Sequence, residues 1–267
     1  MTYRVELLVI GNEILSGQTL DTNSQWLAQR LLEVGLAVNH IQVVEDHVSA
    51  IASAIHNSLS RHTTLLITSG GLGPTFDDLT AQGLAKAARN KLELHPIALE
   101  MVNRRYQNLK AQNLVENAEI TLSRKKMAQL PQGAEPLLNN IGTAPGIKMQ
   151  IDTMILYSLP GVPQELQAMF LEAVIPQIVK FSKKTILQKI VQVPILDESH
   201  LAPLIDRLMD DEPGVYFKSL PRPYQSRQPL RVAITATGFN LKETKALLEN
   251  AIKTLQEITK AHKQTKI

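Results

Sequence analysis

Short apolar runs alternate with amphipathic segments over the first two thirds of the chain. The runs are rich in Val, Ile and Leu, which is typical of strands that are buried on both faces. Between them apolar residues recur at helical spacing, as at Trp26, Leu27 and Leu31, and Gly35 then marks a helix end. The pattern predicts strands at 5–10, 37–44, 64–68 and 153–158, and helices at 23–34, 48–60, 77–89, 96–112 and 163–181. Strands and helices in this order predict an α/β domain with a mostly parallel sheet between two helical layers.

A second, smaller pattern follows residues 182–184, which we interpret as a linker. It predicts strands at 186–193, 215–218 and 230–237, and helices at 198–209 and 241–259. We therefore expect two domains, at 1–181 and 185–260, the second being a small α+β sandwich. The polar stretch 113–146, which contains several prolines and glycines, is expected to be a loop excursion from the first domain.

The amino-acid composition limits the kinds of protein and of functional site that are possible. The 267 residues suit one large and one small domain, and no apolar run approaches the roughly 20 residues that cross a bilayer. No leader pattern follows Met1, so we expect a cytoplasmic protein with no membrane partner. The absence of cysteine excludes disulfides, zinc fingers, iron–sulfur clusters and thiol nucleophiles, so a metal would have to bind carboxylate, imidazole or water.

The net charge of +3 is unevenly distributed, because residues 182–267 hold 14 Lys and Arg against 9 Asp and Glu. A basic segment admits an RNA-binding module, but a solvated lysine-rich face is the commoner explanation. The segment contains only Gly214 and Gly238, which cannot form the Gly-x-x-Gly clamp of KH domains. A nucleic-acid partner is therefore not expected, and a ligand contact from Arg222 or Arg227 is left open.

The strongest candidate site follows the third predicted strand. Three glycines within four positions lead to a hydroxyl and two acidic residues, in the segment Ser69-Gly70-Gly71-Leu72-Gly73-Pro74-Thr75-Phe76-Asp77-Asp78. Glycines let backbone N–H groups converge on an anion, and ligands of open α/β sheets bind beyond the carboxyl ends of the strands. The segment lacks both the Walker A lysine and the Gly-x-Gly-x-x-Gly spacing. It predicts a phosphate-binding loop of another kind.

Asp77 and Asp78 fall at the start of the predicted helix 77–89. Consecutive helical residues point about 100° apart, so only one of the two is expected to face a ligand. The alternative is that both simply cap the helix. A carboxylate beside a bound phosphate would repel it, so a functional role requires a divalent cation between them.

Further polar residues follow the other strands. Glu13 lies in the glycine-flanked segment after the first strand, Asn23 opens the next helix, and Asp46 follows the second strand. The alternatives are a solvent-exposed Glu13, helix capping by Thr22 or Asn23, and helix capping by Asp46. Gly161 and Glu165 follow the fourth strand and either form a turn or reach the same crevice. No histidine has metal-ligand spacing, and no Ser/His/Asp set is evident.

Four motifs together resemble the CinA (competence/damage-inducible protein A) family, whose N-terminal part is a molybdopterin-binding (MoCF biosynthesis) domain. They are Gly11-Asn12-Glu13-Ile14-Leu15-Ser16-Gly17, Asp21-Thr22-Asn23, Gly70-Gly71-Leu72-Gly73-Pro74-Thr75-x-Asp77-Asp78 and Leu159-Pro160-Gly161-x-Pro163-x-Glu165-Leu166. The resemblance covers about residues 3–180, and more weakly 185–260. It implies a three-layer α/β/α molybdopterin-binding-like sheet domain followed by a small α+β (KH-like) domain.

For the CinA branch the resemblance also implies a pyrophosphatase that acts on ADP-ribose-like nucleotides and depends on a divalent cation (Mg, Mn or Co). In the wider family the residue matching Asp78 is functional, and Asp46 is a candidate for a second such residue. Longer bacterial members carry a C-terminal deamidase domain, and we expect no deamidase activity because this chain stops before it. Related folds often assemble, so we expect a homo-oligomer.

Three functions are therefore open. The leading hypothesis is a hydrolase that splits ADP-ribose into AMP and a phosphosugar. In it Ser69 to Thr75 bind the diphosphate, Asp78 with Asp46 or Glu13 holds the cation, and the remaining candidates, Asn23, Gly161 and Glu165, orient the ligand. The alternative is a non-catalytic or transferase protein that binds a pterin phosphate in the same crevice. An RNA-associated module is the third.

Overall fold

The computed structural model describes residues 3–221 and 228–264. The candidate ligand contacts Arg222 and Arg227 lie outside the described residues. The chain divides into two compact units, one formed by residues 1–31 and 37–181 and the other by residues 32–36 and 182–267.

The first unit is built on a six-stranded sheet with the strand order β2-β1-β3-β8-β7-β6. β1, β2, β3 and β8 run parallel, whereas β7 is antiparallel to both of its neighbours, β8 and β6. The strands are β1 (Val5–Ile10), β2 (Val38–Val44), β3 (Leu65–Ser69), β6 (Glu135–Leu137), β7 (Gly146–Ile151) and β8 (Met154–Leu159). Because β7 is reversed, its first residues lie at the sheet edge where the parallel strands end.

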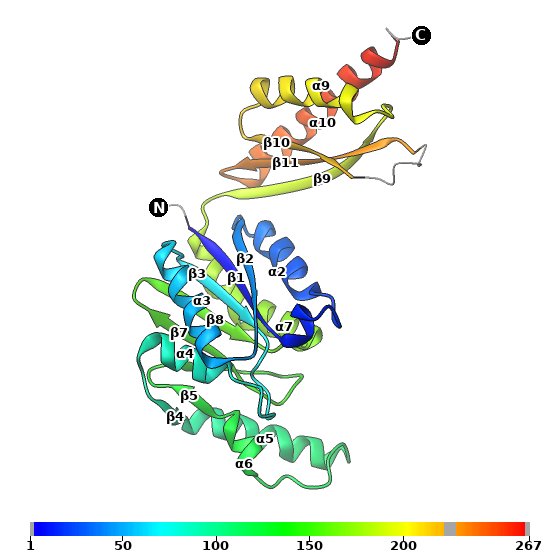
Figure 1. The fold of residues 1–267 in the computed structure, drawn as a ribbon. Helices are drawn as coiled ribbons and strands as arrows, with labels where there is room; N and C mark the ends of the chain where they lie inside the picture. Colours follow the sequence, from blue (N-terminus) through cyan, green and yellow to red (C-terminus); the bar gives the residue numbers. More distant parts are fainter. Residues whose placement is uncertain (1–2, 222–227, 265–267) are drawn as a thin grey trace. The chain divides into compact units, whose positions relative to one another are not determined.

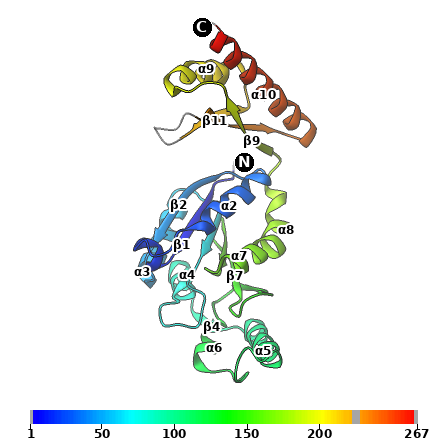
Figure 2. The same cartoon turned by 90° about the vertical axis from the view of Figure 1, so that its right-hand side faces the viewer.

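Helices cover both faces of this sheet. Figures 1 and 2 show α3 and α4 on one face and α2, α7 and α8 on the other, which confirms the predicted three-layer fold. The helices of the unit are α1 (Asn12–Leu15), α2 (Thr22–Glu33), α3 (Val48–Ser60), α4 (Thr80–Ala88), α5 (Pro96–Ala111), α6 (Leu122–Lys126), α7 (Pro163–Met169) and α8 (Ile175–Ile178).

Two predictions about this unit are wrong. The supposed loop 113–146 contains α6, β6 and the strand β5 (Gln129–Pro131), which pairs with β4 (Leu92–Leu94). The single helix predicted over 163–181 is interrupted by a π-helical turn at Phe170–Val174 and ends in a 3₁₀ turn. Pro176 follows the π turn, and it has no N–H for the regular helical ladder.

The second unit is a three-stranded antiparallel sheet, order β10-β11-β9, with two helices, as the sequence pattern predicts. Its core contains Leu201, Phe217, Val232 and Leu255, all of which are buried. Its elements are β9 (Thr185–Val193), α9 (Glu198–Asp211), β10 (Val215–Leu220), β11 (Leu230–Gly238) and α10 (Leu241–Gln264). Within the described residues of the whole chain, every helix is too short or too polar to cross a membrane.

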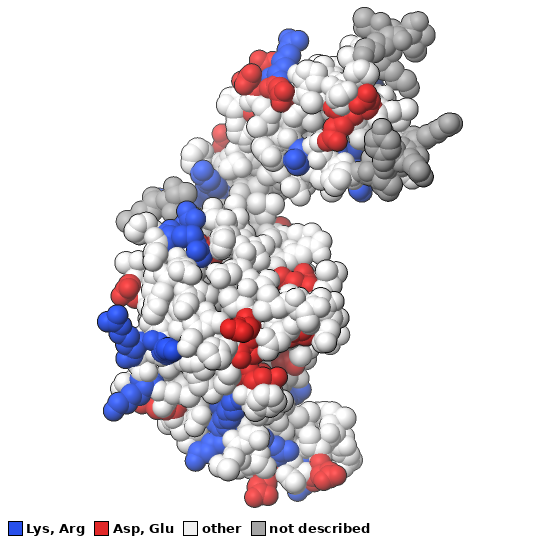
Figure 3. Space-filling model, in the orientation of Figure 1, with Lys and Arg blue, Asp and Glu red and all other residues white. Residues whose placement is uncertain are grey.

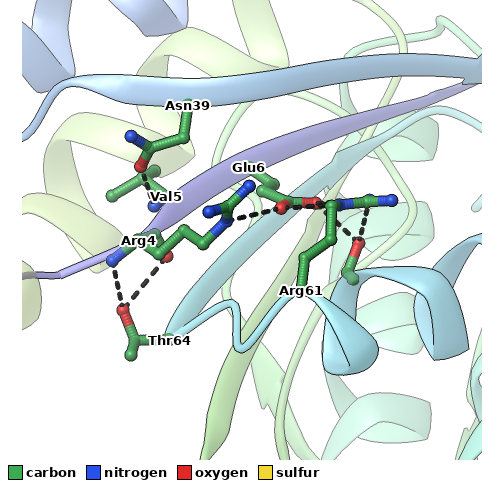
Figure 4. Close-up of polar contacts among 7 residues, drawn as sticks. Arg4, Val5, Glu6, Asn39, Arg61 and Thr64 are labelled. Carbon is green, nitrogen blue, oxygen red and sulfur yellow. Dashed lines mark hydrogen bonds and ion pairs between the residues drawn. The ribbon is translucent and has the colours of Figure 1, made fainter.

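An ionised residue is buried at the start of β1, at the end of the strand remote from the glycine loop (Figure 4). Glu6 is 1% exposed, and its carboxylate accepts hydrogen bonds from Arg61 Nη2 at 2.6 Å, Ser58 Oγ at 2.9 Å and Arg4 Nε at 3.3 Å. Burial acts to raise the pKa of Glu6, but these hydrogen bonds, above all that of Arg61, outweigh it and lower the pKa to about 2. The cluster ties the start of β1 to the end of α3.

We expect this cluster to make the first unit sensitive to acid. A folded pKa of about 2, below the ordinary 4.5, stabilises the native state above pH 4.5, and this stabilisation is lost as the pH falls towards 2. Between about pH 6 and about pH 3 the stability difference between wild type and Glu6→Gln should shrink by about 2 kcal/mol. Urea unfolding followed by Trp26 fluorescence, the single tryptophan, measures it. The exposed Glu116→Gln serves as the control. A difference in the free energy of unfolding that stays constant with pH would contradict the prediction.

Candidate functional site

A cavity of about 430 Å³ opens where β1, β3 and β8 end and β7 begins. This is the edge at which ligands of open α/β sheets bind. The cavity takes in every predicted site residue except Asn23 and Ser69. Those that line it are Glu13, Asp46, Gly70, Gly71, Gly73, Thr75, Asp77, Asp78, Gly161 and Glu165.

The glycine loop makes a tight reversal directly after β3. Gly70 has a φ of +101°, and a Cβ there would lie 2.2 Å from the carbonyl oxygen of Ile10. A Cβ on Gly71, with a φ of +66°, would lie 2.4 Å from Thr80 Oγ1. The buried Thr80 hydroxyl donates to the Gly70 carbonyl at 2.7 Å, which fixes the loop to the first residue of α4. Only glycine suits both positions, because a side chain would meet strained backbone and occupied space.

Asp77 and Asp78 both line the cavity, contrary to the expectation that only one would. The helix α4 begins at Thr80, so helical spacing does not apply to the two residues. Neither caps that helix, because its N-cap is Leu79, with no side-chain cap. Asp78 Oδ2 instead accepts hydrogen bonds from the Thr75 N–H at 2.8 Å and the Thr75 hydroxyl at 2.7 Å. The same hydroxyl contacts Asp77 Oδ1 and, with Lys126 adding a smaller effect, lowers the pKa of Asp77.

Asp46 is anchored by the first residue of α1. Its Oδ2 accepts the Asn12 N–H at 2.7 Å, and it does not cap α3, whose N-cap is His47. Burial raises the pKa of Asp46, and the charges of Glu13, Asp77 and Asp78 raise it further, although the Asn12 hydrogen bond opposes this. The carboxylate of Asp46 is therefore close enough to those of Glu13, Asp77 and Asp78 to be repelled by their charges. A cation placed among them would relieve this repulsion.

The donor set suits a hard cation bound partly through water. Among the described residues, all of the ionisable groups that line the cavity are carboxylates, and oxygen donors are those that Mg²⁺ and Mn²⁺ prefer. Across residues 3–221 and 228–264, no group of three or more His, Asp or Glu side chains is placed to hold a metal ion. One or two carboxylates, together with waters and an oxygen of the ligand, are the usual ligands of Mg²⁺.

The far wall of the cavity comes from the segments around β8. Asn23 Nδ2 donates to the Gly161 carbonyl at 2.7 Å, so Asn23 supports this turn from α2 and lies outside the cavity. The predicted alternative of helix capping by Thr22 or Asn23 is wrong, because α2 begins at Thr22, and Asp21 Oδ1 accepts the Ser24 N–H at 2.9 Å. Ser69 is 4% exposed at the end of β3 and does not line the cavity either.

Residues 6–180 match a family model described as "Probable molybdopterin binding domain". This chain belongs to that family. A protein of Aeropyrum pernix is 39% identical over 257 residues, which are 96% of this chain and 92% of the relative. A protein of Pyrococcus horikoshii is 40% identical over 201 residues, 75% of this chain and 78% of the relative.

A solved structure described as the protein CinA with unknown function, from Thermoplasma acidophilum, is 33% identical and superposes with a TM-score of 0.60. The match covers 67% of this chain and 98% of that one. The predicted resemblance to CinA proteins is therefore confirmed. All residues of the cavity lie within the molybdopterin-binding domain.

Sequence reasoning missed one wall of the cavity in this molybdopterin-binding domain. Thr143 and Ala144 line it, from the segment directly before β7. Glu165 packs on this segment, because its Oε2 accepts Asn139 Nδ2 at 2.7 Å and lies 1.8 Å from where a Gly142 Cβ would be. The glycine and proline residues at 142–146 were the sequence feature that could have indicated this wall. They lie at the sheet edge because β7, which was not predicted, follows them.

Figure 3 shows the charge on one face of the molybdopterin-binding domain. Acidic side chains gather near α1 and the loop after β3, while below them, over the part that holds α5 and α6, Lys and Arg side chains lie among further Asp and Glu side chains. The cavity is therefore acidic in a chain whose net charge is +3. An anionic ligand would need a cation to enter it.

Proposed function

We propose that the cavity binds the phosphate of a phosphorylated pterin, with a divalent cation between that phosphate and the carboxylates of Asp78 and Asp46. Membership of the molybdopterin-binding family supports the pterin class. The observation that carries the proposal is the presence of a strained glycine loop and several carboxylates in the lining of one cavity. The N–H groups of Gly70 and Thr75 are already paired, with Leu159 O and Asp78 Oδ2, so the proposal relies on those of Gly71, Leu72 and Gly73 to bind the anion. The carboxylates are unfavourable to an anion unless a cation accompanies it.

Each residue has a distinct part in this proposal. Thr75 fixes the Asp78 carboxylate and Asn12 fixes that of Asp46, so both are oriented before a ligand arrives. Prior orientation lowers the entropy cost of binding. Glu165, held by Asn139, lines the same cavity and would orient the pterin ring, whose N–H groups suit a carboxylate acceptor.

The second candidate is hydrolysis of an ADP-ribose-like nucleoside diphosphate, and the place of Asp46 in the cavity, fixed by the Asn12 N–H, favours it. A carboxylate within reach of a water molecule can act as its general base. Water oxygen would bond to one phosphorus, the bond from that phosphorus to the bridging oxygen would break, and the bridging oxygen would leave on the other phosphate. Asp46 would take the proton of the water. The products would be AMP and a phosphosugar. A bound cation would supply charge neutralisation and a lower pKa for the water.

Calorimetric titration of a phosphorylated 6-substituted pterin tests the first proposal. We expect binding in the micromolar range with Mg²⁺ and affinity at least about tenfold weaker in EDTA, since the carboxylates then repel the phosphate. Equal affinity in both buffers would contradict the role of the cation, and no binding in either would contradict the pterin. Chromatography of ADP-ribose incubated with Mg²⁺, Mn²⁺ or Co²⁺ tests the second candidate, which requires release of AMP.

A further inference from the structure

A second cavity, of about 350 Å³, lies in the first unit between α5 and the loop 138–145. α5 is at the end of this unit that Figure 2 draws lowest, with α6 and β4 beside it. One wall is apolar and includes Ile97 and Leu138, which are 54% and 53% exposed. Large apolar side chains this exposed at the mouth of a pocket would be covered by a bound molecule.

The helix α5, which supplies Ile97, also gives the cavity basic residues. Arg104 and Arg105 line the cavity with Glu100 as the single acidic residue among the described ones, and Glu100 is already paired with Arg104 at 2.5 Å. Arg105 donates through Nη2 to the carbonyl of Ile141, and its Nε is buried with no hydrogen-bond partner in the described part of the chain. An unsatisfied buried N–H of a cation is costly, and guanidinium groups match phosphate oxygens in geometry. Because Arg105 lines the cavity, its guanidinium group is placed to meet an anion that enters it.

This cavity is distinct from the acidic one but adjoins it. Thr143 lines both, and Asn139, which lines the second, holds the Glu165 carboxylate that lines the first. The loop 138–145 is thus the partition between a cavity lined by carboxylates and a cavity lined by arginines. The first can take an anion only together with a cation, whereas the second needs no cation to do so.

We propose that the cavity between α5 and the loop 138–145 is a second binding site, which takes a small organic phosphate with a flat or apolar body. The phosphate binds Arg105, and the body lies against the apolar wall that includes Ile97 and Leu138. Asn108, exposed on α5, lines the cavity near the arginines and donates to the same ligand through its amide. Binding here needs no metal.

Equilibrium dialysis of the full chain with labelled AMP in EDTA tests the proposal. Without a metal, AMP is repelled by the acidic cavity, so bound AMP reports on the second site. We expect Arg105→Gln to weaken binding about tenfold or more, because it removes a charge-assisted contact. Asn108→Asp should weaken it comparably by repulsion. Lys125→Gln, a loss of charge at an exposed position on α6, should leave it unchanged.

Asp78→Asn, which removes one of the negative charges that repel an anion from the acidic cavity, separates the two sites. If it strengthens metal-free AMP binding while Arg105→Gln leaves that binding unchanged, AMP occupies the acidic cavity and the proposal is wrong. Absence of AMP binding by wild type at millimolar concentration would also overturn it. If Trp26 fluorescence shows that Arg105→Gln does not fold, AMP binding by Asn108→Asp, which changes an exposed residue, tests the proposal instead. Because the pterin experiment depends on metal and this one does not, failure of either is recognised independently.

Discussion

Replacing Asp78 with asparagine is expected to weaken Mg²⁺-dependent ligand binding by about 100-fold. Two opposite unit charges about 4 Å apart attract by about 4 kcal/mol at an effective dielectric of 20, so the loss of one carboxylate charge is large even after partial compensation. The asparagine carbonyl oxygen can still accept the Thr75 N–H that Asp78 accepts at 2.8 Å, so the loop should keep its form. Titration of the phosphorylated pterin in Mg²⁺ measures the effect.

The matched control is Asp152→Asn in the turn between β7 and β8. Asp152 is exposed, and its φ of +51° lies in the left-handed region, which asparagine tolerates well. It should bind as wild type does. If Asp78→Asn retained wild-type affinity in Mg²⁺, Asp78 would not be a ligand of the cation, and Asp46 would be left as the principal candidate.

Much of the site was predictable because three parallel strands mark its edge. The runs at Val5–Ile10 and Leu65–Ser69 are apolar throughout, and the residues directly after a parallel strand lie at one edge of the sheet. Glu13, Asp46 and the glycine loop meet there for this reason. The geometry of Asp77 and Asp78 was not predictable from helical spacing, because the Thr75 hydrogen bonds hold them in a turn ahead of α4.

The antiparallel strand β7 escaped prediction for a different reason. Its sequence, Gly146–Ile151, begins with glycine and carries Lys148 and Gln150 among its apolar residues, so it lacks the uninterrupted apolar run of the parallel strands. Its position is set by pairing with β8, which begins three residues after β7 ends. Pairing with a neighbouring strand can form a strand from residues whose own strand preference is weak. Thr143, Ala144 and the whole second cavity depend on it.

Gly70→Ala should be the most destabilising single substitution in the glycine loop. The new Cβ would lie 2.2 Å from the Ile10 carbonyl oxygen at a φ of +101°, so both the loop and the end of β1 must move. We expect a loss of about 3 kcal/mol or more of the free energy of unfolding, together with loss of Mg²⁺-dependent binding.

Gly17→Ala provides the comparison, since Gly17 has a φ of +74° but nothing within 4 Å of its Cβ position. It should cost about 1 kcal/mol, the backbone strain alone. Urea unfolding followed by Trp26 fluorescence measures both variants. Equal losses would mean that steric contact with β1 contributes nothing and that only the positive φ matters.

The central place of β8 in the sheet has a consequence for biosynthesis. Thr68 in β3 donates to Ser158 in β8 at 2.7 Å across 90 residues of sequence, and both side chains are fully buried. While the chain emerges from the ribosome, β1, β2 and β3 can pair early, but the edge of β3 stays open until β8 has been synthesised. An open, apolar strand edge is a template for aggregation. The nascent protein is therefore most exposed to misassembly, and most in need of a chaperone, during the synthesis of α5, α6 and the cavity wall that comes after them.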